Sequence, residues 1–142
     1  MDITTTGTLE WPITQVWELV SSFADLEAWH PEIERSEVQG MGVGATRKLH
    51  FADKTVVERL DERDDDRNTV VYSVVESTRP ATVGVSGRIK LTEDSADQTA
   101  IVWITSLPPA AEGFAAELRR YYPRRIEHLR EALKARFPRS DS

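Results

Sequence analysis

The chain has 142 residues, 39% hydrophobic and 30% charged, a composition typical of a folded globular domain with its own core. Its 24 acidic and 18 basic residues give a net charge of −6, which argues against a surface for nucleic acid or anionic membranes. The absence of cysteine excludes disulfides, thiol nucleophiles and cysteine-based metal sites. We expect one domain over residues 1–142.

The first residues, MDITTTGTLEW, have neither the basic region nor the apolar stretch of a signal peptide. No apolar run in the chain approaches the ~18 residues of a membrane span. We therefore expect a cytoplasmic protein without stable membrane insertion.

The N-terminal third combines one strand with helical segments. Residues 3–10 alternate in the manner of a strand, and Pro12 then suits the first turn of a helix. A second short helical piece is expected over residues 25–33. The first helix is predicted by apolar residues at helical spacing, namely Ile13, Val16, Trp17, Val20 and Phe23.

From Ser36 onward the apolar period changes to two, which indicates strands. The turns between them are GMGVG, ADK, DERDDDR, ESTRP and EDSADQ. The predicted strands cover residues 36–40, 45–51, 55–61, 69–76, 82–92 and 99–106.

A long amphipathic helix is predicted over residues 111–137, with Pro123 expected to kink it. Its predicted inner stripe is Phe114, Leu118, Tyr122, Ile126 (or Arg125), Leu129 and Leu133. The order of elements predicts an α+β fold, in which an antiparallel meander is covered on one face by this helix. A curved sheet around one helix leaves space for a small-molecule pocket.

Three segments together resemble the START-like (SRPBCC, birch-pollen-allergen-like) superfamily, in its polyketide cyclase/dehydrase-like branch. They are VWELVSSFADLEAWHPEIE, GMGVGATR, and ERLDERDDDR followed by VVYSV. The resemblance implies a helix-grip fold: a curved seven-stranded antiparallel sheet around a long C-terminal helix, with two short helices after strand 1. The gate and latch segments of the related abscisic-acid receptors are missing at residues 52–54 and 76–81, so a hormone-receptor function is not expected.

Glu58 is the residue that the alternation makes conspicuous, because it shares a strand face with Val56 and Leu60. A two-residue turn at residues 53–54 would make Arg47 its diagonal neighbour on the inward face. A longer turn is the alternative, because Asp-Lys is not a favoured turn pair. The register of the two-residue turn pairs Phe51 with Val56, Leu49 with Glu58, and Arg47 with Leu60.

Two interpretations of Glu58 remain open at this point. Arg47 could simply neutralise a buried carboxylate, or the pair could line a wet cavity and orient a polar group of a ligand. The resemblance favours the second, since a Glu matching Glu58 faces the ligand cavity in the related receptors. Burial and Arg47 act on the charge of Glu58 in opposite directions, so its protonation state stays open.

Other candidate ligand-binding residues face the same side. On the strands, the candidates are Arg47, Leu49, Phe51, Val56, Glu58, Tyr72, Trp103 and Thr105; on the last helix they are Phe114, Leu118 and Tyr122. Packing in an ordinary core explains several of them equally well. Within residues 82–92, apolar alternation places Val83, Val85, Ile89 and Leu91 inward, whereas a family-style alignment would turn Ser86 inward.

No metal site or cofactor is expected. His30, His50 and His128 lack metal-ligand spacing, and we expect His50 to face solvent. For His30 we expect a cap or surface position, with a position near the cavity entrance as the alternative. The acidic run lacks the ligand pattern of a calcium loop.

We therefore expect the chain to bind a small hydrophobic or amphipathic molecule of polyketide, isoprenoid or lipid-like type, as a carrier or sensor. The alternative is a polyketide cyclase or dehydratase that uses Glu58 as acid or base. A third possibility is an interaction module with a filled interior.

Overall fold

The computed structural model describes residues 1–24 and 26–138, and its strands form one antiparallel sheet. The sheet order is β1-β7-β6-β5-β4-β3-β2, so β2 to β7 form a meander and β1 pairs with β7. The strands are β1 (Asp2–Leu9), β2 (Ile33–Gln39), β3 (Thr46–Phe51), β4 (Thr55–Asp64), β5 (Thr69–Ser77), β6 (Ser86–Ser95) and β7 (Gln98–Ser106).

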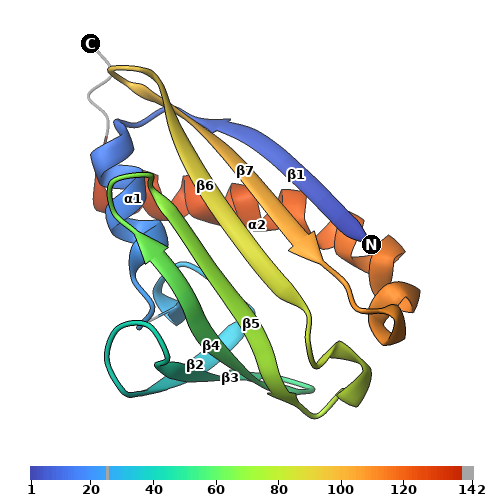
Figure 1. Ribbon diagram of the computed structural model, residues 1–142. Helices are drawn as coiled ribbons and strands as arrows, with labels where there is room; N and C mark the ends of the chain where they lie inside the picture. Colours follow the sequence, from blue (N-terminus) through green and yellow to red (C-terminus); the bar gives the residue numbers. More distant parts are fainter. Residues whose placement is uncertain (25, 139–142) are drawn as a thin grey trace.

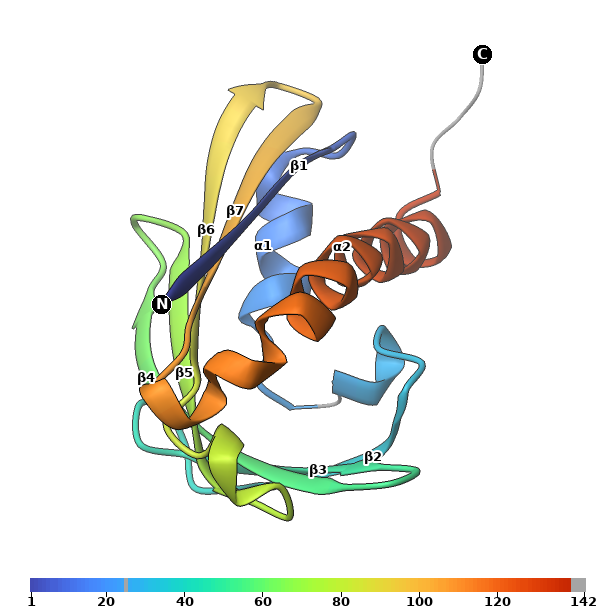
Figure 2. The same ribbon diagram turned by 90° about the vertical axis from the view of Figure 1, so that its right-hand side faces the viewer.

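The helices lie on the concave side of this sheet. Figure 1 shows α2 crossing behind the strands, and Figure 2 shows the sheet curving around α2 with α1 on the same side. This arrangement confirms the predicted helix-grip fold. The helices are α1 (Ile13–Ser21) and α2 (Ala115–Arg136), with 3-10 helices η1 (Leu26–Ala28), η2 (Pro80–Thr82) and η3 (Pro109–Phe114).

Alternation fixes which residues of β6 face the helices. Ile89 and Leu91 are buried while Arg88 is exposed, so the apolar alternation holds and Ser86 is not turned inward. Val83 was expected inward but is 43% exposed. The reason is that residues 80–82 form η2, and the strand begins only at Ser86.

The C-terminal helix differs from the prediction at its start. Residues 109–114 wind as the 3-10 helix η3 before α2 begins, following the two prolines at positions 108–109. Pro123 lies inside α2, which continues through it. The buried residues of α2 are Ala115, Tyr122, Arg125, Ile126, Leu129 and Leu133.

The predicted register between β3 and β4 is wrong by two residues. Arg47 is directly opposite Glu58, and Leu49 is opposite Val56. The connection is longer than two residues, and the Phe51 N–H donates to the Lys54 carbonyl at 2.9 Å. A shift of two keeps every side chain on its predicted face, because the side-chain period of a strand is two.

Two further boundaries differ from expectation. Strand β4 continues to Asp64, which pairs with Thr69 across a short turn where Asn68 has φ 48°. The second helical piece is a single 3-10 turn, and Asp25, where we expected it to start, lies outside the described residues. Over the described part of the chain, no helix is long and apolar enough to cross a membrane.

Candidate ligand pocket

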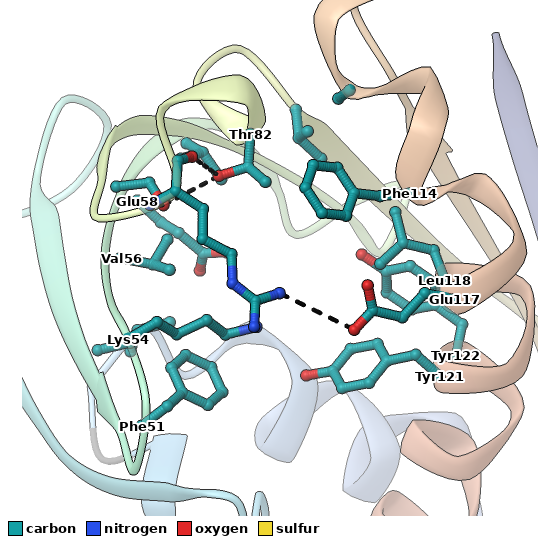
Figure 3. A pocket seen from close by; sticks show the side chains of 16 residues that line it. Phe51, Lys54, Val56, Glu58, Thr82, Phe114, Glu117, Leu118, Tyr121 and Tyr122 are labelled. Carbon is teal, nitrogen blue, oxygen red and sulfur yellow. Dashed lines mark hydrogen bonds and ion pairs between the residues drawn. The ribbon is translucent and has the colours of Figure 1, made fainter.

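An open pocket lies between the sheet and the C-terminal helix, as Figure 3 shows. One wall comes from β3, β4, β5 and the η2 turn, and the other from η3 and the first turns of α2. The pocket has a volume of about 140 Å³ and is open to solvent on one side. The lining residues are Leu49, Phe51, Lys54, Val56, Glu58, Val74, Ser77, Arg79, Thr82, Val85, Ala111, Phe114, Glu117, Leu118, Tyr121 and Tyr122.

Seven of the predicted site residues lie in this lining. On the helical wall, Phe114, Leu118 and Tyr122 follow one another at intervals of four, which places them on one face. Phe114 and Leu118 are only half-buried, because they border open space rather than the sheet. The strand wall contributes Leu49, Phe51, Val56 and Glu58.

Glu58 and Arg47 form a buried ion pair at the inner side of this pocket. Their side chains are 13% and 8% exposed, and Arg47 Nε and Nη2 lie 2.8 and 2.7 Å from Glu58 Oε1. The Arg47 guanidinium also lies 4.4 Å from the ring of Phe23 and 5.2 Å from that of Tyr72. Both carboxylate contacts end on Oε1. Arg47 therefore neutralises the charge of Glu58 through Oε1 alone, and Oε2 has no bond to a described residue.

Two smaller hollows, of about 20 and 60 Å³, lie among buried side chains next to this pocket. Arg47, Tyr72 and Trp103, three of the predicted residues, line both rather than the open pocket. The Trp103 Nε1–H donates to the Tyr72 hydroxyl at 3.1 Å, which fixes the two rings. The Tyr72 ring fits only because Gly87 opposes it: a Cβ there would meet Tyr72 Cζ and Oη at 2.6 Å.

Thr105 is the predicted site residue that the structure sets apart. It is 1% exposed on β7 and is not among the residues that line these three hollows. Contact of Thr105 with a ligand therefore stays a prediction from the sequence.

Charged residues at the mouth of the pocket were missing from the prediction. Arg79, on the turn before η2, lies 3.1 Å from Asp53 and 3.9 Å from Glu117 of α2. The second contact is the dashed line that reaches Glu117 across the opening in Figure 3. Lys54 lies 4.8 Å from the ring of Phe51. Loop residues such as these carry no periodicity, so only the fold brings them together.

Three phenols line the pocket and the inner hollows, and all stay protonated near neutral pH. Burial raises the pKa of Tyr122 to about 12 and raises the pKa values of Tyr72 and Tyr121 well above their usual range. Nearby acidic groups, including Glu58, act in the same direction. The Tyr72 hydroxyl accepts from Trp103, so its own O–H can donate a hydrogen bond to a bound molecule.

The prediction for His30 is wrong. It is 1% exposed and its Nε2 lies 2.7 Å from the hydroxyl of Tyr121, so it belongs to the interior rather than to a cap or the surface. The neighbouring Trp29 could have indicated this position, because a large aromatic residue is usually buried; Trp29 is buried here and its ring stacks with that of His30. His50 lies opposite Arg35 on the outer side of the sheet and contacts Glu37 at 2.8 Å. Among the described residues, no group of three or more His, Asp or Glu side chains could hold a metal ion.

Comparison with known proteins identifies a family whose model matches nearly the whole chain. The family model described as "Polyketide cyclase / dehydrase and lipid transport" matches residues 1–138. This match confirms the resemblance drawn from the sequence. No curated protein matches the chain.

Solved structures share the fold over nearly the whole chain. A protein from Nitrosospira multiformis is 20% identical with a TM-score of 0.82, covering 98% of this chain and 100% of its own. The Zhui aromatase/cyclase of Streptomyces sp. R1128 is 23% identical with a TM-score of 0.77, and the match covers 94% of each chain. Norcoclaurine synthase from Thalictrum flavum, solved with dopamine and hydroxybenzaldehyde, is 14% identical with a TM-score of 0.78, covering 99% of this chain and 89% of its own. At these identities the likeness concerns the fold.

Proposed function

The chain belongs to the polyketide cyclase / dehydrase and lipid transport family, and we propose that it works as a single cytoplasmic domain that binds a small hydrophobic or amphipathic molecule. The bound molecule lies between the sheet and the C-terminal helix, and the protein acts as a carrier or sensor. The ligand is of polyketide, isoprenoid or lipid-like type.

The observation that carries this proposal is the lining of the open pocket. Its walls are mostly apolar or aromatic, with the Glu58 carboxylate, paired with Arg47, at the inner side and charged residues at the mouth. Sites for small molecules combine these two properties: apolar area supplies affinity, and a few polar groups fix orientation. An interior that served only for packing would not leave Phe114 and Leu118 facing open space.

Titration with an apolar fluorescent probe tests the proposal. We expect saturable binding of about one probe per chain. Leu118→Trp places a larger side chain in the open pocket and should weaken binding at least about tenfold, since it removes apolar area available to the probe. Ala116→Trp adds the same group on the exposed side of the same helix and should leave binding unchanged. Equal affinity in both variants would place the probe elsewhere.

A second function, acid–base catalysis by Glu58, is favoured by one specific observation. Oε2 of Glu58 has no bond to a described residue, while Oε1 holds Arg47, so one oxygen is available for a proton of a bound carbonyl compound. Polyketide cyclases and dehydratases perform reactions of this class, and an aromatase/cyclase shares the fold.

Glu58→Gln separates the two functions. A carrier keeps its ligand with a modest loss of affinity, whereas an acid–base enzyme keeps binding and loses turnover by about 100-fold or more. The substrates to try are those carbonyl-bearing aromatic compounds that displace the probe. Turnover that survives in Glu58→Gln would remove Glu58 from any chemistry.

A further inference from the structure

Arg125 is a buried cation without a counter-ion. It lies on α2, is 4% exposed, and its Nη1 atom has no hydrogen-bond partner among the described residues. No described carboxylate forms an ion pair with it, in contrast to Arg47, which holds Glu58. An unpaired buried charge is costly, so its presence calls for an explanation.

Aromatic rings form the immediate surroundings of Arg125. Its guanidinium carbon lies 4.5 Å from the ring of Trp29, 5.6 Å from that of Tyr121 and 5.8 Å from that of Trp103. These faces attract a cation but accept no strong hydrogen bond, so they hold the guanidinium in place and leave its Nη1 without an acceptor.

The two inner hollows both border Arg125, and they contain more donors than acceptors. Arg47 and Arg125 line both, while Glu58, which lines one, neutralises Arg47 alone. Tyr72 also lines both hollows and accepts from Trp103, so its own O–H is free to donate. Arg125 therefore carries a positive charge that no described carboxylate neutralises, at the edge of both hollows.

One of these hollows adjoins the open pocket. The two share Leu49, Phe51, Glu58, Tyr121 and Tyr122 in their linings, so these side chains form the boundary between them. A group that passes this boundary from the apolar pocket reaches Arg125.

We infer that Arg125 binds the carboxylate of a hydrophobic carboxylic acid whose apolar body lies in the open pocket. A planar guanidinium matches a carboxylate in shape and donates two parallel hydrogen bonds to it. The hollow of about 60 Å³ admits only a small head group such as a carboxylate. The inference rests on the function proposed above and adds the charge class of the ligand.

The test compares a dansyl-labelled undecanoic acid with its uncharged methyl ester. Wild type should bind the acid at least about tenfold more tightly, because a hydrogen bond to a charged group is the stronger kind. Arg125→Met removes the charge at similar length and should abolish this preference, while affinity for the ester stays the same. Arg120→Met removes an exposed arginine of the same helix and should keep the preference.

Stability separates a binding role from a purely structural one. If Arg125 serves a ligand, Arg125→Met removes an unpaired buried charge and unfolds at an equal or higher urea concentration than wild type. A variant of lower stability with unchanged acid preference would overturn the inference. Arg125→Lys provides a second variant that keeps the charge and should retain part of the preference.

The wild-type protein alone distinguishes the remaining failures. Equal binding of acid and ester by wild type would overturn the role of Arg125, but it would still support a ligand-binding pocket. Binding of neither compound would overturn the pocket together with this inference.

Discussion

Glu58 and Arg47 show how one residue pair can serve both folding and binding. The pair sits directly across two strands, with both side chains largely buried. Such a pair stabilises little relative to apolar packing, but removing one partner leaves a buried charge alone. Its position beside the pocket gives a reason to keep a charged pair where apolar residues would pack as well.

Glu58→Leu should therefore lower the free energy of unfolding by about 3 kcal/mol, because Arg47 loses its carboxylate. The double variant Arg47→Met/Glu58→Leu should recover most of this loss. Urea denaturation measures both, with Glu76→Leu, an exposed residue of β5, as a control within about 0.5 kcal/mol of wild type. A double variant as unstable as Glu58→Leu would show that the two charges are not coupled.

Gly87 determines where the Tyr72 ring lies. A Cβ at residue 87 would overlap the ring, so Gly87→Ala should cost about 1–3 kcal/mol in unfolding free energy. Gly113→Ala is the matched control, since no atom lies within 4 Å of a Cβ there. Equal stability of the two variants in urea would mean that Tyr72 moves aside at no cost.

Single buried polar residues were the hardest part of the site to predict. Alternation predicted that Glu58 and Arg47 share a face, because a strand has a fixed period. Arg125 appeared only as an alternative to Ile126 in the helix stripe, and in the structure both are buried. His30 lies in a loop without periodicity, and contacts with Phe51 of β3 and Tyr121 of α2, far away in the sequence, bury it.

At the scale of elements, the strands were predictable and their ends were not. The change from a helical to a two-residue period located every strand of the meander. The turn between β3 and β4 was not predictable, since Asp-Lys has no strong turn preference, and the register shifted by two with it. The strand residues predicted to line the pocket were still assigned to the correct face, because a shift of two residues keeps each side chain on the same side of the sheet.

The contact between the η2 turn and α2 closes one side of the pocket mouth. Both partners are exposed, at 37% for Arg79 and 58% for Glu117, so the pair adds little to stability. Glu117→Gln should leave the urea midpoint unchanged and speed dissociation of the bound probe severalfold, since it removes a bridge across the opening. Stopped-flow dilution measures this rate, with Glu112→Gln on the exposed side of η3 as a control. Equal dissociation rates in both variants would contradict a role for the bridge.

At the scale of the whole molecule, one helix against a curved sheet explains both the fold and the hollow. Residues at the C-terminal end of α2, such as Leu129 and Leu133, are fully buried, whereas Phe114 and Leu118 near its start border open space. Ala115 near the start of the helix also packs in a buried cluster with Ile3 of β1, so the opening depends on the side chains of Phe114 and Leu118 and not on a separation of the whole helix from the sheet. The sequence could predict this architecture from the order of elements, but the position of the opening also depends on the curvature of the sheet.

The most direct test of the central claim is methyl NMR of the valines during titration with the dansyl-labelled acid. Val56, Val74 and Val85 line the pocket, while Val38 and Val43 are exposed and lie outside its lining. The account predicts saturable shifts of the first three resonances and constant positions for the last two. Shifts confined to the exposed valines, or saturable binding that moves none of the pocket valines, would contradict it.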